Sequence, residues 1–205
     1  MGLTVQTLRQ AVARAAESAR KAEDELNTAD GKLGDGDTGV MLRRLLEKLS
    51  AAASGDQQDL GAVFQSLGTA SASATGSSLG TLVTVSMLTL AKETQGQTDL
   101  PWEKFGPLLQ KVRDVMMARG GATLGDKTVV DVLDAVATAI VGLSDPADIQ
   151  VRAREATQTT LDTFRDRPNR LGRARMFAEK SVGLDDPGML AFSRLLEGLE
   201  AQDVR

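Results

Sequence analysis

The 205-residue sequence contains no cysteine, no histidine and no tyrosine. Without cysteine there can be no disulfide, no thiolate metal ligand and no nucleophilic thiol. Without histidine there is no imidazole base, no imidazole metal ligand and no site for a phosphohistidine. Any metal must therefore be a hard cation bound through oxygen, such as Mg²⁺, Ca²⁺ or Mn²⁺, rather than zinc.

Aromatic residues and charge of one sign are also scarce. One tryptophan and five phenylalanines leave the core to leucine, valine, alanine and methionine. The 24 basic and 28 acidic residues give a net charge of −4, which argues against the basic face of a nucleic-acid-binding protein. No apolar run approaches the roughly 18 residues of a transmembrane helix, and no apolar signal run begins the chain. We therefore expect a cytoplasmic protein that binds neither nucleic acid nor membrane.

Apolar residues recur at helical spacing through almost the whole chain. Alternating strand patterns and Asn-Gly hairpin signals are lacking. The nearly all-apolar stretch 79–90 is expected to be deeply buried, and Pro101 is expected in the first turn of its helix. The helical stretches are expected at about 5–27, 41–49, 60–67, 79–90, 101–116, 128–140, 145–164 and 173–180, with a last segment from 187. We predict one all-α domain over residues 1–205, with about eight helices packed around one core.

Most of the 20 glycines fall at the junctions between these helices, beside Asp, Thr, Ser, Lys or Arg. The junctions are 34–39, 76–80, 120–125, 172 and 183–188. Each one alone is compatible with an ordinary helix cap or turn. Because glycine allows positive φ angles and close approach of the backbone to a ligand, five such junctions favour a phosphate- and metal-binding mouth at one end.

The first junction contains three aspartates within eight residues, Asp30, Asp35 and Asp37, separated by glycines. Carboxylates this close repel one another by about 1 kcal/mol per pair even in a high dielectric. A divalent cation is the simplest group to offset that repulsion, and Mg²⁺ prefers a few carboxylates together with phosphate oxygens. The loop also opens a helix, whose N-terminal amides favour phosphate. The alternative is a solvated turn with aspartates that cap helices.

Two segments resemble known ligand-binding motifs, an EF-hand loop and a P-loop, but their residue spacing does not match. An EF-hand loop needs a third oxygen ligand and a glycine at offsets where this chain has Gly39 and Val40. Segment 120–128 looks like a P-loop, but Asp126 separates the last glycine from Lys127 and no expected strand precedes it. We interpret neither segment as the named motif.

The aspartate loop and four later segments, taken in order, resemble the nucleotide-binding L subunit (or L domain) of dihydroxyacetone kinases. The matching segments are Asp30 with 34–39, Ala74-Thr75-Gly76, Gly120 with Gly125-Asp126-Lys127-Thr128, Gly172-Arg173-Ala174 and Asp186-Pro187-Gly188. The resemblance covers about residues 26–190. Thr75 replaces a serine of that family, Ser77-Ser78 replaces its Pro-Leu, and Arg175 and Met176 stand where it often has serine and tyrosine. Because of these departures, the resemblance implies that the substrate is either dihydroxyacetone or a related ketose.

The resemblance implies an eight-helix antiparallel barrel with an ADP–Mg²⁺ complex at one end. It implies that Asp30, Asp35 and Asp37 hold two Mg²⁺ ions that bridge the phosphates. The nucleotide (ADP/ATP) residues it implies are Thr38, Gly39, Val40, Met41, Ala74, Thr75, Gly120, Val129, Arg173, Asp186, Pro187 and Gly188. No catalytic residue beyond these metal and phosphate ligands is expected. Lys127 either joins the pocket or forms a salt bridge with Asp126 or another loop carboxylate.

The resemblance further implies a phosphotransferase subunit that passes a phosphoryl group through bound nucleotide to a small ketose. In that family a histidine on a separate K subunit holds the sugar, so this histidine-free chain is expected to need such a partner. A free-standing L chain favours the version in which bound ADP is recharged by a phosphohistidine protein of the phosphotransferase system. The alternatives are a subunit of an ATP-dependent kinase for another ketose, and a nucleotide-sensing module that contacts a transcription factor.

Overall fold

The computed structural model describes residues 2–74 and 76–199. This part of the chain forms eight α-helices, three short 3₁₀ helices and two very short strands. In chain order they are β1 (Gly2–Thr4), α1 (Val5–Asp30), α2 (Thr38–Ala53), α3 (Leu60–Ala72), α4 (Ser78–Glu93), β2 (Asp99–Pro101), η1 (Trp102–Lys104), α5 (Phe105–Gly120), α6 (Val129–Ala139), α7 (Pro146–Arg165), η2 (Arg173–Phe177), η3 (Glu179–Ser181) and α8 (Pro187–Leu199). The predicted all-α fold is confirmed.

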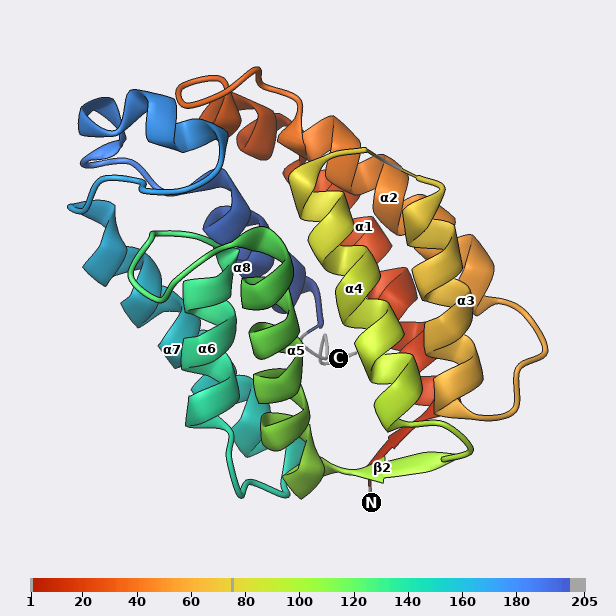
Figure 1. Cartoon of the computed structure of the whole chain (residues 1–205). Coiled ribbons are helices and arrows are strands. Elements are labelled where there is room, and N and C mark those ends of the chain that lie inside the picture. Colours follow the sequence, from red (N-terminus) through yellow and green to blue (C-terminus); the bar gives the residue numbers. More distant parts are fainter. Residues whose placement is uncertain (1, 75, 200–205) are drawn as a thin grey trace, which may run out of the picture.

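The helices run alternately up and down around a ring (Figure 1). Each helix packs mainly on its neighbours in the sequence, and α8 packs on α1. The ring is therefore closed as an antiparallel barrel. One consequence of the alternation is that α2, α4, α6 and α8 all begin at the same end of the molecule (Figure 1).

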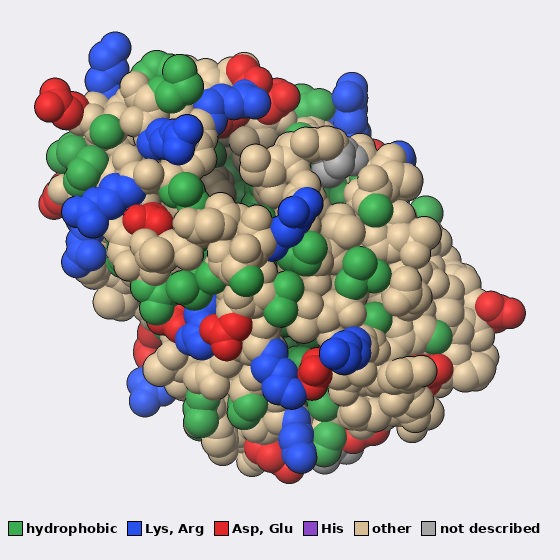
Figure 2. Space-filling model, in the orientation of Figure 1, with side chains coloured by type: hydrophobic (Ala, Val, Ile, Leu, Met, Phe, Trp, Pro, Cys, Tyr) green, Lys and Arg blue, Asp and Glu red, His purple; other side chains and the backbone are tan. Residues whose placement is uncertain are grey.

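Aliphatic side chains fill the interior, as the scarcity of aromatics predicts. The largest buried cluster joins α1 to α6 and α8, and it includes Leu26, Leu45, Leu60 and Val63, each 0% exposed. A smaller cluster, which includes Val132, lies where α6, α7 and α8 meet. Acidic and basic side chains are interspersed over the face drawn in Figure 2. No helix among the described residues has both the length and the apolar character needed to cross a membrane.

Helix α4 is less buried than its sequence predicts. Only Gly80, Ser86, Leu90 and Ala91 are buried, and Leu88 is 39% exposed. The helix packs on α3 on one side and on α5 on the other. A helix in the wall of a ring keeps an outward face, so an apolar composition cannot bury it all round. The expectation of a deeply buried helix was wrong for this reason.

Two short segments also differ from the sequence prediction. Pro101 ends β2, which pairs antiparallel with β1, and α5 begins only at Phe105 after the turn η1. The expected helix over 173–180 consists of the two 3₁₀ turns η2 and η3. Strands of three residues are too short to show alternation, and short apolar spacings do not distinguish an α-helix from a 3₁₀ turn.

Candidate functional site

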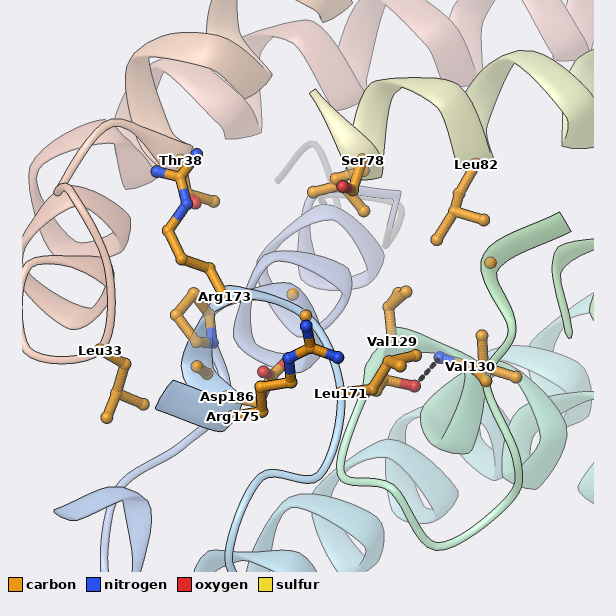
Figure 3. A pocket seen from close by; sticks show the side chains of 18 of the residues that line it. Leu33, Thr38, Ser78, Leu82, Val129, Val130, Leu171, Arg173, Arg175 and Asp186 are labelled. Atoms are coloured by element: carbon orange, nitrogen blue, oxygen red, sulfur yellow. Dashed lines mark hydrogen bonds between the residues drawn. The ribbon is translucent and has the colours of Figure 1, made fainter. Parts of the chain in front are cut away.

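A cavity of about 710 Å³ lies at the end of the barrel where the even-numbered helices begin. Its lining includes the first residue of each of these four helices, which are Thr38, Ser78, Val129 and Pro187. The first three are labelled in Figure 3. A helix N-terminus carries about half a positive elementary charge from the aligned peptide dipoles. Four such ends around one cavity produce a positive potential that favours an anion.

Each of these helix starts is capped by a side chain of the protein. Ser77 accepts a hydrogen bond from the Gly80 amide, Thr128 from the Val130 amide and Asp186 from the Met189 amide. At the start of α2, Asn27 Oδ1 accepts hydrogen bonds from the amides of Gly39 (2.8 Å) and Val40 (3.2 Å). The amides of Gly39 and Val40 are thus bound by the Asn27 side chain in this structure.

The three aspartates of the first junction meet beside this cavity. Carboxylate oxygens of Asp30, Asp35 and Asp37 lie within 4.8 Å of one another. Asp30 is buried at the end of α1, and its Oδ2 accepts hydrogen bonds from the amides of Gly36 (3.0 Å), Asp37 (3.0 Å) and Thr38 (3.3 Å). Asp35 and Asp37 are exposed. Asp30 therefore shapes the loop, and the other two carboxylates face outward beside it.

Gly34 is required for this arrangement. A Cβ atom at position 34 would lie 2.5 Å from Oδ1 of Asp30. Any side chain there would displace the carboxylate that organises the loop. The glycine thus allows the backbone to pass closely over Asp30.

The electrostatics of the cluster show the repulsion that the sequence predicts. A hydrogen bond from Arg173, the main cause, lowers the pKa of Asp35. Desolvation, followed by the negative charge of Asp35, raises the pKa of Asp37. Three convergent carboxylates with no nitrogen or sulfur donor suit a hard divalent cation such as Mg²⁺. The donor set fits the implied metal.

Arginines approach the cavity from two sides. Arg173 extends from η2 toward the start of α2, and Arg175 lines the cavity from the same 3₁₀ turn (Figure 3). Arg119 lines it from the last turn of α5. Within residues 2–74 and 76–199, neither the Arg119 nor the Arg175 side chain makes an ion pair or a hydrogen bond. These cations add to the positive potential of the helix starts.

Asp186 lines the cavity and directly precedes α8. Its Oδ1 accepts a hydrogen bond from Asn169 Nδ2 (2.8 Å), and its Oδ2 accepts one from the Met189 amide (3.0 Å). Desolvation outweighs these hydrogen bonds and raises the pKa of Asp186 to about 6. This carboxyl group therefore titrates near neutral pH.

Lys127 does not point into the cavity, and the salt bridge to a loop carboxylate that the sequence suggested does not form. The residue is fully buried, with a positive φ of 62°. Its ammonium group donates to the carbonyl oxygens of Arg165 (3.1 Å), Arg167 (2.8 Å) and Ser181 (2.8 Å). Lys127 is thus neither a P-loop lysine nor a surface cation.

The structure brings most of the predicted site residues to one place. The predicted residues that line the cavity are Asp30, Thr38, Gly120, Val129, Arg173, Asp186, Pro187 and Gly188, with Asp35 and Asp37 beside Asp30. Gly39, Val40, Met41 and Ala74 lie outside its lining, and Thr75 lies outside the described residues. Their proposed roles as ligands stay predictions.

Several residues of the cavity wall were not predicted as site residues from the sequence. Most are apolar or small side chains, including Leu33, Ser78, Leu79, Thr81, Leu82, Ala122, Val130 and Leu171. Ser78, Leu79 and Ala122 fall within the predicted glycine junctions but were not singled out as site residues, and the others belong to no motif, because they become neighbours only in the fold. Arg119 had a signal, since it directly precedes the predicted Gly120.

Comparisons with known proteins agree with this geometry. Residues 32–201 match the model of the DAK2 domain. The chain is 28% identical to the "PEP-dependent dihydroxyacetone kinase, ADP-binding subunit DhaL" of Escherichia coli over 85% of each chain. It is 31% identical to the "D-erythrulose kinase" of Mycolicibacterium smegmatis over 84% of this chain but 31% of that one. It thus spans most of the separate ADP-binding subunit and about a third of the longer kinase.

Solved structures match at the level of the fold. The crystal structure of the dihydroxyacetone kinase of C. freundii in its native form has a TM-score of 0.74 at 22% identity, over 93% of this chain and 33% of that one. The complex of that kinase with AMP-PNP and Mg²⁺ has a TM-score of 0.73 at 20% identity, over 97% of this chain and 34% of the other. Both likenesses support the barrel architecture.

Fold and cavity together define an all-α barrel with a site for an anion and a hard cation at one end. The match over most of the sequence makes the assignment specific: the chain belongs to the DAK2 domain family. The curated relatives it matches are named as dihydroxyacetone kinase subunits and erythrulose kinases, which are phosphotransferases. The resemblance to the L subunit of dihydroxyacetone kinases is confirmed.

Proposed function

We propose that this chain is the ADP/ATP- and Mg²⁺-binding subunit of a ketose kinase of the dihydroxyacetone type, with residues 1–205 acting as one nucleotide-binding domain. One observation carries the proposal: the acidic cluster lies beside a cavity that is lined by Asp30 and by the starts of four helices. A cation alone would be repelled by the helix dipoles, and an anion alone would be repelled by the aspartates. A metal–phosphate complex places its cation beside the aspartates and its anion beside the helix starts, so both charges are offset.

Different residues would bind the metal and the nucleotide of such a complex. Asp30, Asp35 and Asp37 would hold Mg²⁺, as two ions, on the side of α1 and α2. Thr38, Arg173 and the start of α8 would face the phosphates and the rest of the nucleotide. Bound Mg²⁺ would neutralise charge that develops on the transferred phosphoryl group. Positioning and charge neutralisation supply most of what phosphoryl transfer needs, so the lack of a histidine base is no obstacle.

The ketose would be held by a separate K subunit, because this chain has no histidine to capture it. The E. coli relative is named as PEP-dependent and a Lactococcus lactis relative as PTS-dependent. These names favour recharging of bound ADP by a phosphohistidine protein of the phosphotransferase system, in the cytoplasm. The erythrulose kinases among the relatives keep open a related ketose as the acceptor. No nucleic acid or membrane partner is proposed.

The test is phosphoryl transfer in a defined mixture. The purified chain is combined with a ketose-binding K subunit, Mg²⁺, dihydroxyacetone or erythrulose, and either ATP or a phosphohistidine donor protein. We expect sugar phosphate only when chain, K subunit and Mg²⁺ are all present. ADP binding without any sugar phosphate from either donor would contradict the enzyme assignment and favour a nucleotide sensor.

A further inference from the structure

Lys127 is the one buried lysine of the described residues, and it has no carboxylate partner. An ammonium group carries three N–H donors, and here each donor meets a backbone carbonyl oxygen. Its positive φ costs free energy in any residue other than glycine. A buried charge in a strained conformation persists only where the surroundings require it. The positions of the three carbonyl oxygens in the chain show what Lys127 holds in place.

The three carbonyls lie at the two ends of one segment. Arg165 and Arg167 lie where α7 ends, and Ser181 ends η3. The two ends also bind each other, because the Asn169 amide donates to Ser181 Oγ (2.8 Å) and the Gly183 amide donates to the Arg165 carbonyl (2.8 Å). Segment 165–183 is therefore a loop closed at its base, with Lys127 bound to both ends. We call it the arginine loop, because it carries Arg173 toward the aspartate cluster.

The same base connects the arginine loop to two helix starts of the cavity. Asn169 is buried, and its Nδ2 donates both to the Lys127 carbonyl (2.8 Å) and to Asp186 Oδ1 (2.8 Å). The Arg170 amide donates to the Asp126 carbonyl (3.0 Å). Lys127 thus lies where the loop before α6, the end of α7 and the cap of α8 meet.

We propose that Lys127 is a positioning residue that fixes the base of the arginine loop and so orients Arg173 toward the aspartate cluster and the bound phosphates. The part of this proposal that concerns bound phosphates rests on the proposed function. Lysine suits the task because no neutral side chain offers three donors at one atom. The rival account is a plain structural role, in which Lys127 stabilises the fold without acting through Arg173.

A double-mutant cycle distinguishes the two accounts. Stopped-flow displacement measures how fast the fluorescent analogue mant-ADP leaves the Mg²⁺-loaded chain. Lys127→Met is expected to speed dissociation by roughly tenfold, and to have almost no further effect in an Arg173→Ala background, because coupled residues are not additive. Equal effects in both backgrounds would overturn the proposal.

Arg9 provides a matched control. Its guanidinium also donates to three carbonyl oxygens, those of Ala53 (2.8 Å), Gly55 (2.6 Å) and Gln57 (3.0 Å), at the opposite end of the barrel. Arg9→Met therefore removes a similar side-chain anchor without touching the arginine loop. The proposal expects unchanged mant-ADP dissociation in this variant, and acceleration like that of Lys127→Met would contradict it.

A measurement without nucleotide tests the role of Lys127 independently of the proposed function. Hydrogen exchange of the amides in 169–181 should be faster by about tenfold in Lys127→Met but not in Arg9→Met. If Lys127→Met does not fold, Ser181→Ala removes a second contact of the same base and should have the same two effects. Unchanged exchange would overturn the proposal whatever the nucleotide data show. An unmodified chain that binds no mant-ADP would contradict the proposed function, and exchange would still decide whether Lys127 holds the loop.

Discussion

At the scale of single residues, the three aspartates of the cluster have different tasks. Asp30 binds three amides of its own loop through one oxygen, so its first role is to shape the loop. Asp35 and Asp37 are exposed and contribute little to the fold. The exposed pair is therefore the part of the cluster that can be changed without unfolding the loop.

Asp35→Asn and Asp37→Asn should each weaken Mg²⁺-dependent ADP binding by about tenfold or more, because even outer-shell partners of a metal are worth that much. Helicity should be unchanged in both variants. Titration calorimetry and circular dichroism measure the two quantities. Asp56→Asn, an equal change of charge at an exposed position of the loop between α2 and α3, is the control. Unaltered ADP binding in both site variants would count against the assignment of the metal site.

Asp186 should make stability depend on pH. Its pKa is about 6 in the folded protein, above the value of about 3.9 in an unfolded chain, so the folded state binds the proton more tightly. Stability from this residue is therefore lost as the pH rises toward and through 6, and regained as the pH falls. Between pH 7 and pH 5 the unmodified chain should gain about 1 kcal/mol relative to Asp186→Asn. Urea unfolding at both pH values measures this, and parallel pH profiles would refute it.

At the scale of elements, helix starts were predictable because their signals are local. The Asp145 side chain accepts from the amides of Ala147 and Asp148 with Pro146 at the first position, as the sequence predicts. The aspartate loop was predictable for the same reason, since its three carboxylates lie within eight residues. Local sequence signals therefore predicted the helices and the clustering of the three aspartates.

The rest depended on contacts between distant parts of the chain. The outward face of α4 follows from its place in the ring, which no feature of residues 78–93 encodes. The Lys127 ammonium binds carbonyls 38 to 54 residues away, so its sequence neighbours suggested the wrong partners. Likewise Leu33, Leu82 and Val130 line the cavity from three different elements. Such residues become neighbours only when the barrel closes.

The contact between α1 and α2 gives a prediction at the same scale. A Cβ atom at Gly39 would lie 2.1 Å from the Glu23 carbonyl oxygen and 2.8 Å from Asn27 Oδ1. Gly39→Ala should therefore push α2 from α1 and lower the free energy of unfolding by about 1–3 kcal/mol. Chemical denaturation measures the change. Gly76→Ala is the control, because no atom lies within 4 Å of its added Cβ, and equal stabilities of the two variants would contradict this packing account.

At the scale of the whole molecule, the site follows from the topology. Eight alternating helices place every second helix start at one end, so four dipoles point into the same cavity. The loop between α1 and α2 adds three carboxylates at that end. Under the proposed function, the barrel would provide the attraction for phosphate, and the loop would provide the attraction for the cation. Neither half should bind well without the other.

This mutual dependence makes ADP binding with and without Mg²⁺ the most direct measurement. The full chain, first freed of any co-purified nucleotide by chelation and dialysis, is titrated with ADP in a calorimeter, in Mg²⁺ and then in EDTA. We predict equimolar, tight binding in Mg²⁺ and an affinity lower by roughly a hundredfold in EDTA. Binding of equal strength in EDTA, or no binding at any Mg²⁺ concentration, would contradict the account.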